Sequence, residues 1–316
     1  MQMLKAQKLK SGDTIGIMGL GSPLSPERLT AGVAAIEQAG YAVKMPLDPS
    51  RDYGVHTNGF SSGSPSERLR ALHTLLEAPD VRAIIAARGG YGAVDVVPLI
   101  DFQKVRAGKK LIVGCSDTTF LLAQTSVRAG LPSVHGATLG TSFADYASSA
   151  EAKLSVDALF RLLREPGYTY SSGVKVLRGG PLYGTSGQGP LLAGNLSVLT
   201  TLLGTPWDVD YSGAVLVVEE VGESPFRVER SLKHLALAGK FDSLAALVFG
   251  RFSRCEAAHG PAVDEVIERF AQFCPAKFPV VSGLPVGHWG ENQPLPLGCA
   301  AEVVNDCFRL LESPVA

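Results

Sequence analysis

The chain has 316 residues, the length of about two ordinary domains. Its 29 Lys and Arg against 30 Asp and Glu give a net charge of −1, so it lacks the excess positive charge on which nucleic-acid-binding proteins depend. Hydrophobic residues make up 46% of the chain and charged residues 19%. This composition excludes a disordered protein and supplies enough apolar surface for a sizeable core.

The cysteines indicate a reducing compartment. They are five in number and none lies in a CxxC spacing, so the sequence predicts neither a disulfide framework nor a zinc site. The N-terminal segment lacks the pattern of a secretory signal, and no apolar run reaches the ~18 residues of a membrane-spanning helix. We therefore expect a cytoplasmic protein that binds neither nucleic acid nor a membrane.

The first half of the chain alternates strand and helix patterns. Apolar strands are expected over residues 14–18, 41–45, 81–87 and 111–114, and helices over 25–40, 64–77 and 118–129. Ser25 precedes a proline at the first helical position, and Ser64 with Glu67 has the spacing of a capping box. Continuously apolar strands separated by helices predict a parallel sheet covered on both faces.

The second half is more mixed. An amphipathic helix is expected over 149–164, with Ser149 as its N-cap, followed by a stretch over 167–189 that is rich in Gly, Ser, Pro and Tyr. Further helices are expected over 195–203, 225–238 and 263–273, and strands over 214–218, 244–249, 279–282, 297–304 and 308–312. We predict an N-terminal α/β domain over 1–150, a helix and interdomain linker over 151–189, and a C-terminal domain over 190–316.

The turn after the strand at 111–114 has the pattern of a nucleophile elbow. The strand stops at Gly114 and a helix begins about three residues later. A serine at such a tip exposes its hydroxyl beside the free N–H groups of the helix, which makes Ser116 a candidate nucleophile. In the alternative interpretation, Ser116 or Asp117 only caps the helix. Cys115 is a second candidate nucleophile, but a thiol at this position more often packs in the core.

A serine nucleophile needs a base. The six histidines of the chain are His56, His73, His135, His234, His259 and His288. His288 lies between Gly287 and Gly290, just past an expected strand, and is well placed to enter a cleft. The alternative is an ordinary loop histidine with a satisfied side chain.

The base in turn needs an orienting carboxylate. Glu219 follows the apolar strand at 214–218, strand alternation turns Glu220 to the opposite face, and Glu223 starts the next helix. All three could equally be solvated residues at a strand end. With Glu219 as the acid, the chain order Ser, Glu, His matches one known order for triads on parallel sheets.

Cofactor motifs are missing from the sequence. The glycine-rich loops at 19–21 and 88–90 do not fit the dinucleotide fingerprint, and the chain has no GxxxxGK[ST] or HExxH motif. We therefore expect no metal and no organic cofactor.

Several linked motifs together resemble the LD-carboxypeptidase family, the muramoyl-tetrapeptide carboxypeptidases and their relatives. The motifs lie in family order at residues 88–93 (RGGYGA), 114–117 (GCSD), 194–196 (GNL), 204–207 (GTPW), 218–227 (VEEVGESPFR), 287–288 (GH) and 295–298 (LPLG). The resemblance implies a flavodoxin-like parallel-sheet domain at the N-terminus, a smaller C-terminal α/β domain, an active site in the cleft between them, and a homodimer.

The resemblance also implies the roles of particular residues. It makes Ser116 the nucleophile, His288 the general base and Glu219 the acid of the triad. The backbone N–H groups of Gly90 and Asp117 would form the oxyanion hole.

The function implied is that of a serine carboxypeptidase that releases the terminal D-alanine of murein tetrapeptides at an L,D bond during peptidoglycan recycling. Within the same family, the alternative is a hydrolase of acyl-sulfamoyl adenylate antibiotics. A further alternative is a non-catalytic two-domain α/β ligand-binding protein. Recognition of a free terminal carboxylate calls for a cation, and Arg88, Arg227 and Arg230 are the candidates.

Overall fold

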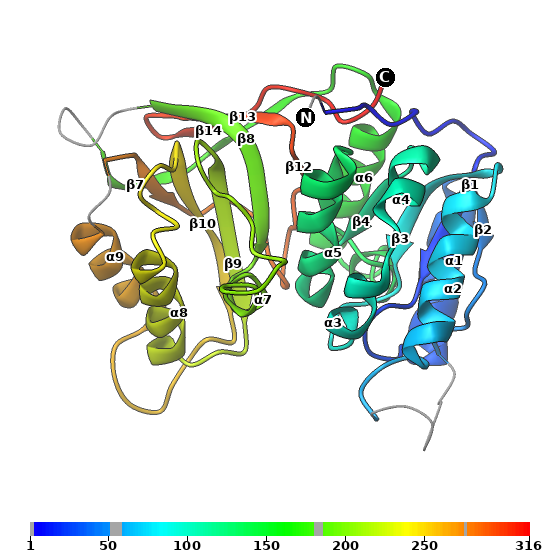
Figure 1. The fold of residues 1–316 in the computed structure, drawn as a ribbon, viewed down its shortest axis with the longest axis horizontal. Coiled ribbons are helices and arrows are strands. Elements are labelled where there is room, and N and C mark those ends of the chain that lie inside the picture. The colour runs from blue at the N-terminus through cyan, green and yellow to red at the C-terminus, as the bar shows by residue number, and fades with distance from the viewer. Residues whose placement is uncertain (1–2, 51–58, 180–185, 275–276) are drawn as a thin grey trace. The chain divides into compact units, whose positions relative to one another are not determined.

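A computed structural model describes residues 3–50, 59–179, 186–274 and 277–316 of the chain (Figure 1). The described residues form two compact units. Unit 1 comprises Met1–Tyr168, Glu291–Pro296 and Ser313–Ala316, and unit 2 comprises Thr169–Gly290 and Leu297–Glu312.

Unit 1 is built on a six-stranded sheet in the order β12-β5-β4-β3-β1-β2. The strands are β1 (Thr14–Met18), β2 (Ala42–Lys44), β3 (Val81–Ala86), β4 (Leu111–Gly114), β5 (Ser133–His135) and β12 (Leu295–Leu297). Strands β1 to β5 pair in parallel, and the order 2-1-3-4-5 is that of flavodoxin-like proteins. The predicted fold class of the N-terminal half is confirmed.

Helices cover this sheet in two groups. One contains α1 (Pro26–Gln38), α6 (Ala150–Arg164) and the turn Leu139–Phe143, and the other contains α2 (Pro65–Glu77), α3 (Ala93–Val96), α4 (Phe102–Gly108) and α5 (Thr119–Gln124). The predicted N-caps are confirmed, since the hydroxyls of Ser25, Ser64 and Ser149 each accept a hydrogen bond from an N–H of the first helical turn.

Unit 2 is built on an eight-stranded mixed sheet in the order β6-β14-β13-β8-β9-β10-β11-β7. The strands are β6 (Tyr170–Gly173), β7 (Lys175–Arg178), β8 (Ser186–Asn195), β9 (Val215–Val221), β10 (Ala246–Ser253), β11 (Val280–Ser282), β13 (Ala300–Val304) and β14 (Cys307–Leu310). Strands β8 to β11 are parallel, and the flanking pairs are antiparallel.

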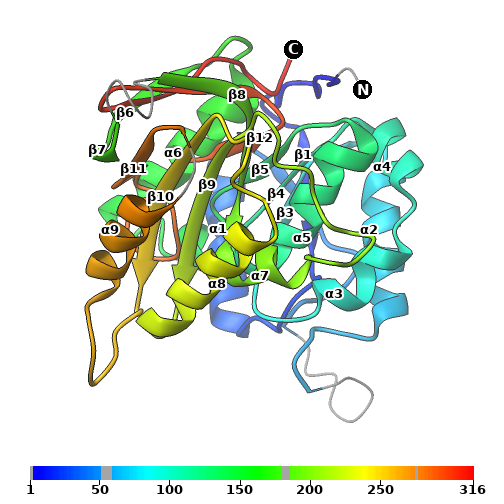
Figure 2. The ribbon, with the colours of Figure 1, turned by 60° about the vertical axis from the view of Figure 1, so that its left-hand side comes forward.

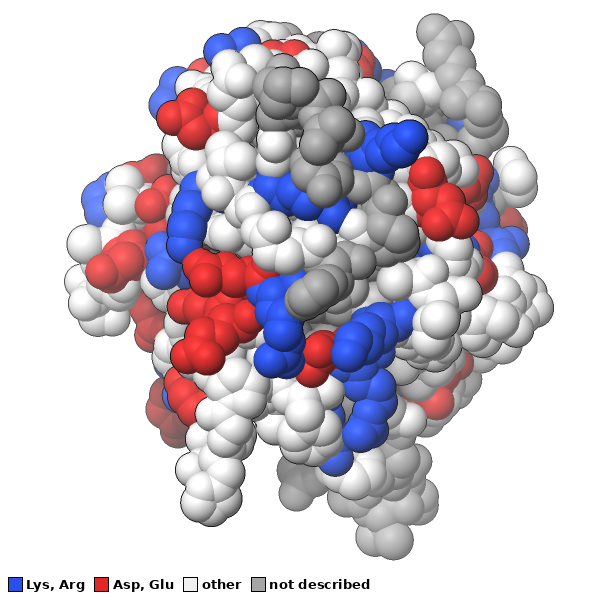
Figure 3. All heavy atoms as spheres, turned by 90° about the vertical axis from the view of Figure 1, so that its left-hand side faces the viewer, with Lys and Arg blue, Asp and Glu red and all other residues white. Residues whose placement is uncertain are grey.

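The helices of unit 2 are α7 (Leu196–Thr201), α8 (Pro225–Leu237) and α9 (Val263–Phe273). Helices α8 and α9 pack together beside the parallel strands (Figure 2). The face on which they lie mixes basic and acidic side chains (Figure 3), with ion pairs such as Lys175–Glu268 and Arg269–Glu229.

Several element boundaries differ from those expected. Helix α6 belongs to unit 1, whereas β6 and β7 lie in the second sheet, so much of the segment 151–189 is regular structure. The strand expected over 297–304 is divided into β12 and β13 by a turn at Gly298, whose φ is +87°. Strand β9 continues to Val221, which places the two glutamates of 219–220 inside the strand.

In residues 3–50, 59–179, 186–274 and 277–316, no helix is both long and apolar enough to cross a bilayer.

Candidate active site

Ser116 occupies a strained turn at the carboxyl end of β4. Its φ is +60°, a left-handed conformation that costs an L-residue about 1–2 kcal/mol. Ser116 is half-buried, whereas the neighbouring Cys115 is buried. The turn Ser116–Thr118 is a single turn of 3₁₀-helix, so the Asp117 N–H at its start has no acceptor within the helix. This is the geometry expected of a nucleophile elbow.

The glycine loop after β3 packs directly against this turn. A Cβ added at Gly89 would lie 2.6 Å from the Ser116 Cβ and 3.0 Å from its Oγ, so only a glycine fits there. The Ser22 N–H donates to the Gly89 carbonyl at 2.9 Å, and the Tyr91 N–H donates to the Ser22 Oγ at 3.1 Å. Ser22 thereby holds the backbone on both sides of Gly90.

Gly90 is itself restricted to glycine. Its φ is +97°, and an added Cβ would lie 2.2 Å from the Ser22 Oγ. The two predicted oxyanion donors, Gly90 and Asp117, therefore lie on two segments of unit 1 that both adjoin Ser116. Both segments follow carboxyl ends of parallel strands, where ligands bind in doubly wound sheets.

The Asp117 side chain joins the same two segments. Its buried carboxylate accepts a hydrogen bond from the Ala93 N–H at 2.9 Å. Burial raises the pKa of Asp117 to about 6, although the Ala93 N–H and the charge of Arg68 oppose that shift.

In unit 2, Glu219 and His288 form a hydrogen-bonded pair. Glu219 Oε2 lies 2.6 Å from His288 Nδ1, and the glutamate side chain is 1% exposed. Burial disfavours the imidazolium, but the Glu219 charge and hydrogen bond outweigh it, so the pKa of His288 is raised above its usual 6.5. Within the described part of the chain, His288 Nε2 has no hydrogen-bond partner.

The turn before His288 also requires a glycine. Gly287 has a φ of +150°, and an added Cβ would lie 3.0 Å from the Arg251 Cβ and 3.6 Å from Glu219 Oε2. A side chain at this position would be strained by the backbone conformation and would crowd the Arg251 side chain, next to the Glu219 carboxylate.

The other two candidate carboxylates are occupied differently. Glu220 is also buried, and it accepts hydrogen bonds from Asn195 Nδ2, the Ser197 N–H and the Val221 N–H at 2.7–2.8 Å. Glu223 is half-buried and lies 3.6 Å from the exposed Arg227 in an ion pair. The interpretation of Glu219 and Glu220 as solvated strand-end residues is therefore wrong, because the strand extends past both and neighbouring elements cover them.

The three arginines suggested as carboxylate readers all make contacts within their own units. Arg88 donates to the Pro23 carbonyl at 3.0 Å, Arg227 pairs with Glu223, and Arg230 lies over the Phe226 ring at 5.4 Å. All three side chains are exposed. Their role in binding a substrate carboxylate stays a prediction.

The remaining histidines are scattered. His73 lies on α2, His135 is buried in β5, and His234 and His259 are exposed in unit 2. His56 lies outside the described residues. Among the residues that the structure describes, no group of three or more His, Cys, Asp or Glu side chains could hold a metal ion.

Comparison with known proteins identifies relatives over both units. Family models of the LD-carboxypeptidase N-terminal and C-terminal domains match residues 15–136 and 188–303. A probable murein peptide carboxypeptidase of Bacillus subtilis is 30% identical over 300 residues, covering 94% of this chain and 90% of that protein.

Solved structures share the fold. A muramoyltetrapeptide carboxypeptidase from Oxalobacter formigenes has a TM-score of 0.81 at 28% identity, covering 94% of this chain and 97% of the other. The microcin C7 self-immunity protein MccF of Escherichia coli is 27% identical over 328 residues, covering 93% of this chain and 91% of MccF. MccF bound to glutamyl sulfamoyl guanosine has a TM-score of 0.84 at 24% identity, covering 99% of this chain and 100% of the other.

Proposed function

Because the chain belongs to the LD-carboxypeptidase family, we propose that it is a serine carboxypeptidase that releases the terminal D-alanine of murein tetrapeptides. The bond cleaved is the L,D bond between the L-centre of meso-diaminopimelate and D-alanine. Relatives named as murein peptide and muramoyltetrapeptide carboxypeptidases support this substrate class. The enzyme would act on recycled peptides in the cytoplasm, as a homodimer and without a metal or organic cofactor.

The observation that carries the proposal is the 2.6 Å hydrogen bond between Glu219 and His288. A buried carboxylate on Nδ1 fixes the tautomer of the ring and stabilises the imidazolium that forms during attack. With Nδ1 occupied in this way, Nε2 is the nitrogen left to take a proton. In this proposal Ser116 of unit 1 supplies that proton, and the three residues act as one triad.

The proposed reaction has two halves. His288 Nε2 takes the proton of Ser116 Oγ while that oxygen attacks the peptide carbonyl, and the Gly90 and Asp117 N–H groups stabilise the resulting oxyanion. Loss of one such donor typically lowers the rate by about 10²–10³. The imidazolium then protonates the leaving amine of D-alanine, and water activated by His288 hydrolyses the acyl-enzyme, which returns the proton to Ser116.

A second function is favoured by the similarity to MccF, whose structures include complexes with aminoacyl sulfamoyl nucleosides. The same proposed triad could hydrolyse the acyl-sulfamoyl bond of such compounds. The two functions differ in the group that leaves, which is D-alanine in one and a sulfamoyl nucleoside in the other.

A mass-spectrometric assay with two substrates tests these proposals. Purified protein is incubated with L-Ala-D-Glu-meso-diaminopimelate-D-Ala and, separately, with aspartyl sulfamoyl adenosine. We expect loss of D-alanine from the tetrapeptide, abolished in Ser116→Ala and retained in the matched control Cys115→Ala. Preferential cleavage of the adenosine compound would instead support the second function.

A serine-directed fluorophosphonate distinguishes an enzyme from a binding protein. We expect it to modify Ser116 in the wild-type protein. A protein that neither reacts with this probe nor cleaves either substrate would be a non-catalytic binding protein, contrary to the proposal.

A further inference from the structure

A fully buried arginine lies behind the glycine loop. Arg68 is on α2, and its side chain is 0% exposed. Burying a charge costs several kcal/mol unless hydrogen bonds and opposite charges compensate it. The partners of its guanidinium therefore indicate what the charge does.

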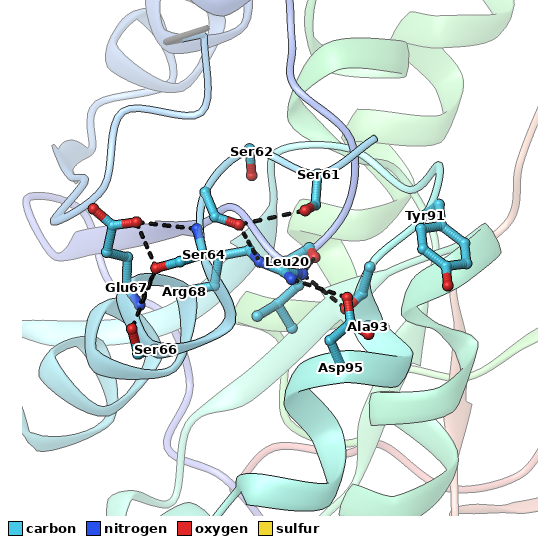
Figure 4. A network of polar contacts seen from close by, with 12 residues as sticks. Leu20, Ser61, Ser62, Ser64, Ser66, Glu67, Arg68, Tyr91, Ala93 and Asp95 are labelled. Carbon is cyan, nitrogen blue, oxygen red and sulfur yellow. Dashed lines mark hydrogen bonds and ion pairs between the residues drawn. The ribbon is translucent and has the colours of Figure 1, made fainter. Parts of the chain in front are cut away.

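Arg68 connects three segments of unit 1 (Figure 4). Its Nη1 donates to the carbonyls of Leu20, which follows β1, and of Gly92, which precedes α3. Its Nε donates to the Gly63 carbonyl at 3.0 Å, and its Nη2 lies 3.3 Å from Asp95 Oδ2 on α3. The guanidinium thus occupies the point where the loops after β1 and β3 meet the start of α2.

One peptide group of the glycine loop is held at both ends. Arg68 donates to the Gly92 carbonyl at 2.7 Å, and the N–H of the next residue, Ala93, donates to the Asp117 carboxylate at 2.9 Å. Carbonyl and N–H belong to the same planar peptide unit, so the two contacts together fix its orientation. Asp117 directly follows Ser116, so this unit is tied to the nucleophile turn.

The space around this peptide unit is closed. Gly92 has a φ of +141°, and an added Cβ would lie 2.5 Å from Arg68 Nη1 and 2.8 Å from the Leu20 carbonyl oxygen. Position 92 therefore admits only a glycine, and the guanidinium packs directly against its backbone two residues after Gly90.

We propose that Arg68 is a positioning residue for the oxyanion hole, holding the Gly92–Ala93 peptide so that the Gly90 N–H keeps its place beside Ser116. Asp117 holds the other end of the same peptide. The inference rests on the proposed serine mechanism, and Arg68 acts in it without touching the substrate.

Lys110 offers a matched control. Like Arg68 it is a buried cation bonded to backbone carbonyls, those of Leu75 and Ala78 at the other end of α2. It precedes β4, whereas Ser116 follows that strand. A cation that only supports the fold should behave like Lys110.

The experiment compares Arg68→Gln with Lys110→Gln. For each variant, kcat and KM on the tetrapeptide and the rate of fluorophosphonate labelling are measured well below its own melting temperature. We expect both variants to melt earlier than the wild type. Only Arg68→Gln should lose about 10–100-fold in kcat and in labelling rate, with KM changed by less than about threefold.

A double-mutant cycle sharpens the test. Asp117→Ala removes the acceptor at the other end of the same peptide, so it should slow labelling by a similar factor. Because both changes loosen the same peptide, which then keeps only the hydrogen bond from the Asp95 N–H to the Gly92 carbonyl, Arg68→Gln with Asp117→Ala should lose little more than the more impaired single variant. If the double variant instead loses the product of the two single losses in labelling rate, the shared-peptide mechanism is wrong.

Other outcomes also decide the question. Equal kcat and labelling rates in folded Arg68→Gln and Lys110→Gln would overturn the proposal. If Arg68→Gln does not fold, Arg68→Lys, which keeps the charge but not the planar fork, must still slow labelling. Labelling of Ser116 does not depend on the natural substrate, so a wild type that is labelled but does not cleave tetrapeptide would contradict the proposed function alone.

Discussion

Glu219 and Glu220 are neighbours in β9, yet their side chains have different hydrogen-bond partners. Glu219 bonds to His288, while Glu220 bonds to backbone and side-chain donors around the start of α7. Strand alternation predicts that the two side chains point in different directions. Their burial could not be predicted from the local sequence, because it depends on elements that pack over β9 from elsewhere in the chain.

Glu219→Gln should change both the rate and its pH dependence. The base form of His288 must be neutral, and its pKa lies above 6.5 because of Glu219, so kcat/KM should fall as the pH drops through that raised pKa. The variant lacks the negative charge, so this acid limb should move to lower pH while the plateau falls by on the order of 10³–10⁴. A pH–rate profile of both proteins checks this. If the acid limb lies at the same pH in both proteins, the group that titrates there is not His288 but another, such as Asp117.

Arg68 could not be identified as part of the candidate site from the local sequence. Ser116 and His288 lie in turns, and Glu219 follows an apolar run, which are sequence patterns typical of catalytic residues. Arg68, in contrast, shares a helical face with Leu72 and Leu75, all three buried. An arginine at an i, i+4, i+7 position among apolar residues is the one sequence pattern that could have marked it as buried. Its partners at Leu20 and Gly92 could not be predicted, because they come from distant parts of the chain.

At the scale of elements, regular structure followed from the sequence and irregular structure did not. Ser–Pro starts and apolar strands predicted α1, α2 and β1 closely. The helix expected over 118–129 instead begins as a 3₁₀ turn and ends in the π-helical turn Thr125–Ala129. Its residues have helical patterning throughout, so tertiary contacts rather than local preference decide the hydrogen-bond spacing.

Helix α7 gives a prediction at this scale. Glu220 accepts two hydrogen bonds from the start of that helix, from Asn195 Nδ2 and the Ser197 N–H, and a third from the Val221 N–H of β9. In Glu220→Gln the amide NH₂ would face at least one of these donors and could not accept its hydrogen bond. We expect a loss of about 1–3 kcal/mol in unfolding free energy with kcat within about threefold. Urea unfolding and tetrapeptide turnover measure the two effects. A loss of kcat as large as that of Glu219→Gln would make Glu220 the triad acid.

At the scale of the whole molecule, unit 1 is assembled from three separate stretches of chain. Glu291–Pro296, which lies between the two stretches of unit 2, and Ser313–Ala316, which follows the second, both belong to it. The Asn292 N–H donates to Ser155 Oγ at 2.9 Å, and Val315 forms a β-bridge with Ala6. Composition and turn signals suggest contiguous domains, because a returning strand leaves no local mark that identifies its partner.

A fragment of residues 1–168 should therefore be incomplete. It lacks β12, the Asn292 contact and the buried Val315. In a thermal unfolding assay, we expect the fragment to melt well below the intact chain. In limited proteolysis, we expect a protease to cut it faster. Val315→Asp in the intact chain should also lower the melting temperature of unit 1 and speed its proteolysis, because the substitution buries an unpaired charge. A fragment as stable as the full chain would show that the returning segments contribute nothing.

The left-handed backbone at Ser116 reverses a familiar ranking of residues. Alanine normally stabilises a protein more than glycine by about 0.5–1 kcal/mol, because glycine loses more freedom on folding. At a φ of +60° the strain of about 1–2 kcal/mol falls on every residue with a Cβ, alanine included. Chemical denaturation should therefore find Ser116→Gly more stable than Ser116→Ala, and at least as stable as the wild type, with neither variant active. The hydroxyl proposed as the nucleophile would then lie where selection for stability alone would favour glycine, an exchange of stability for activity confined to one residue.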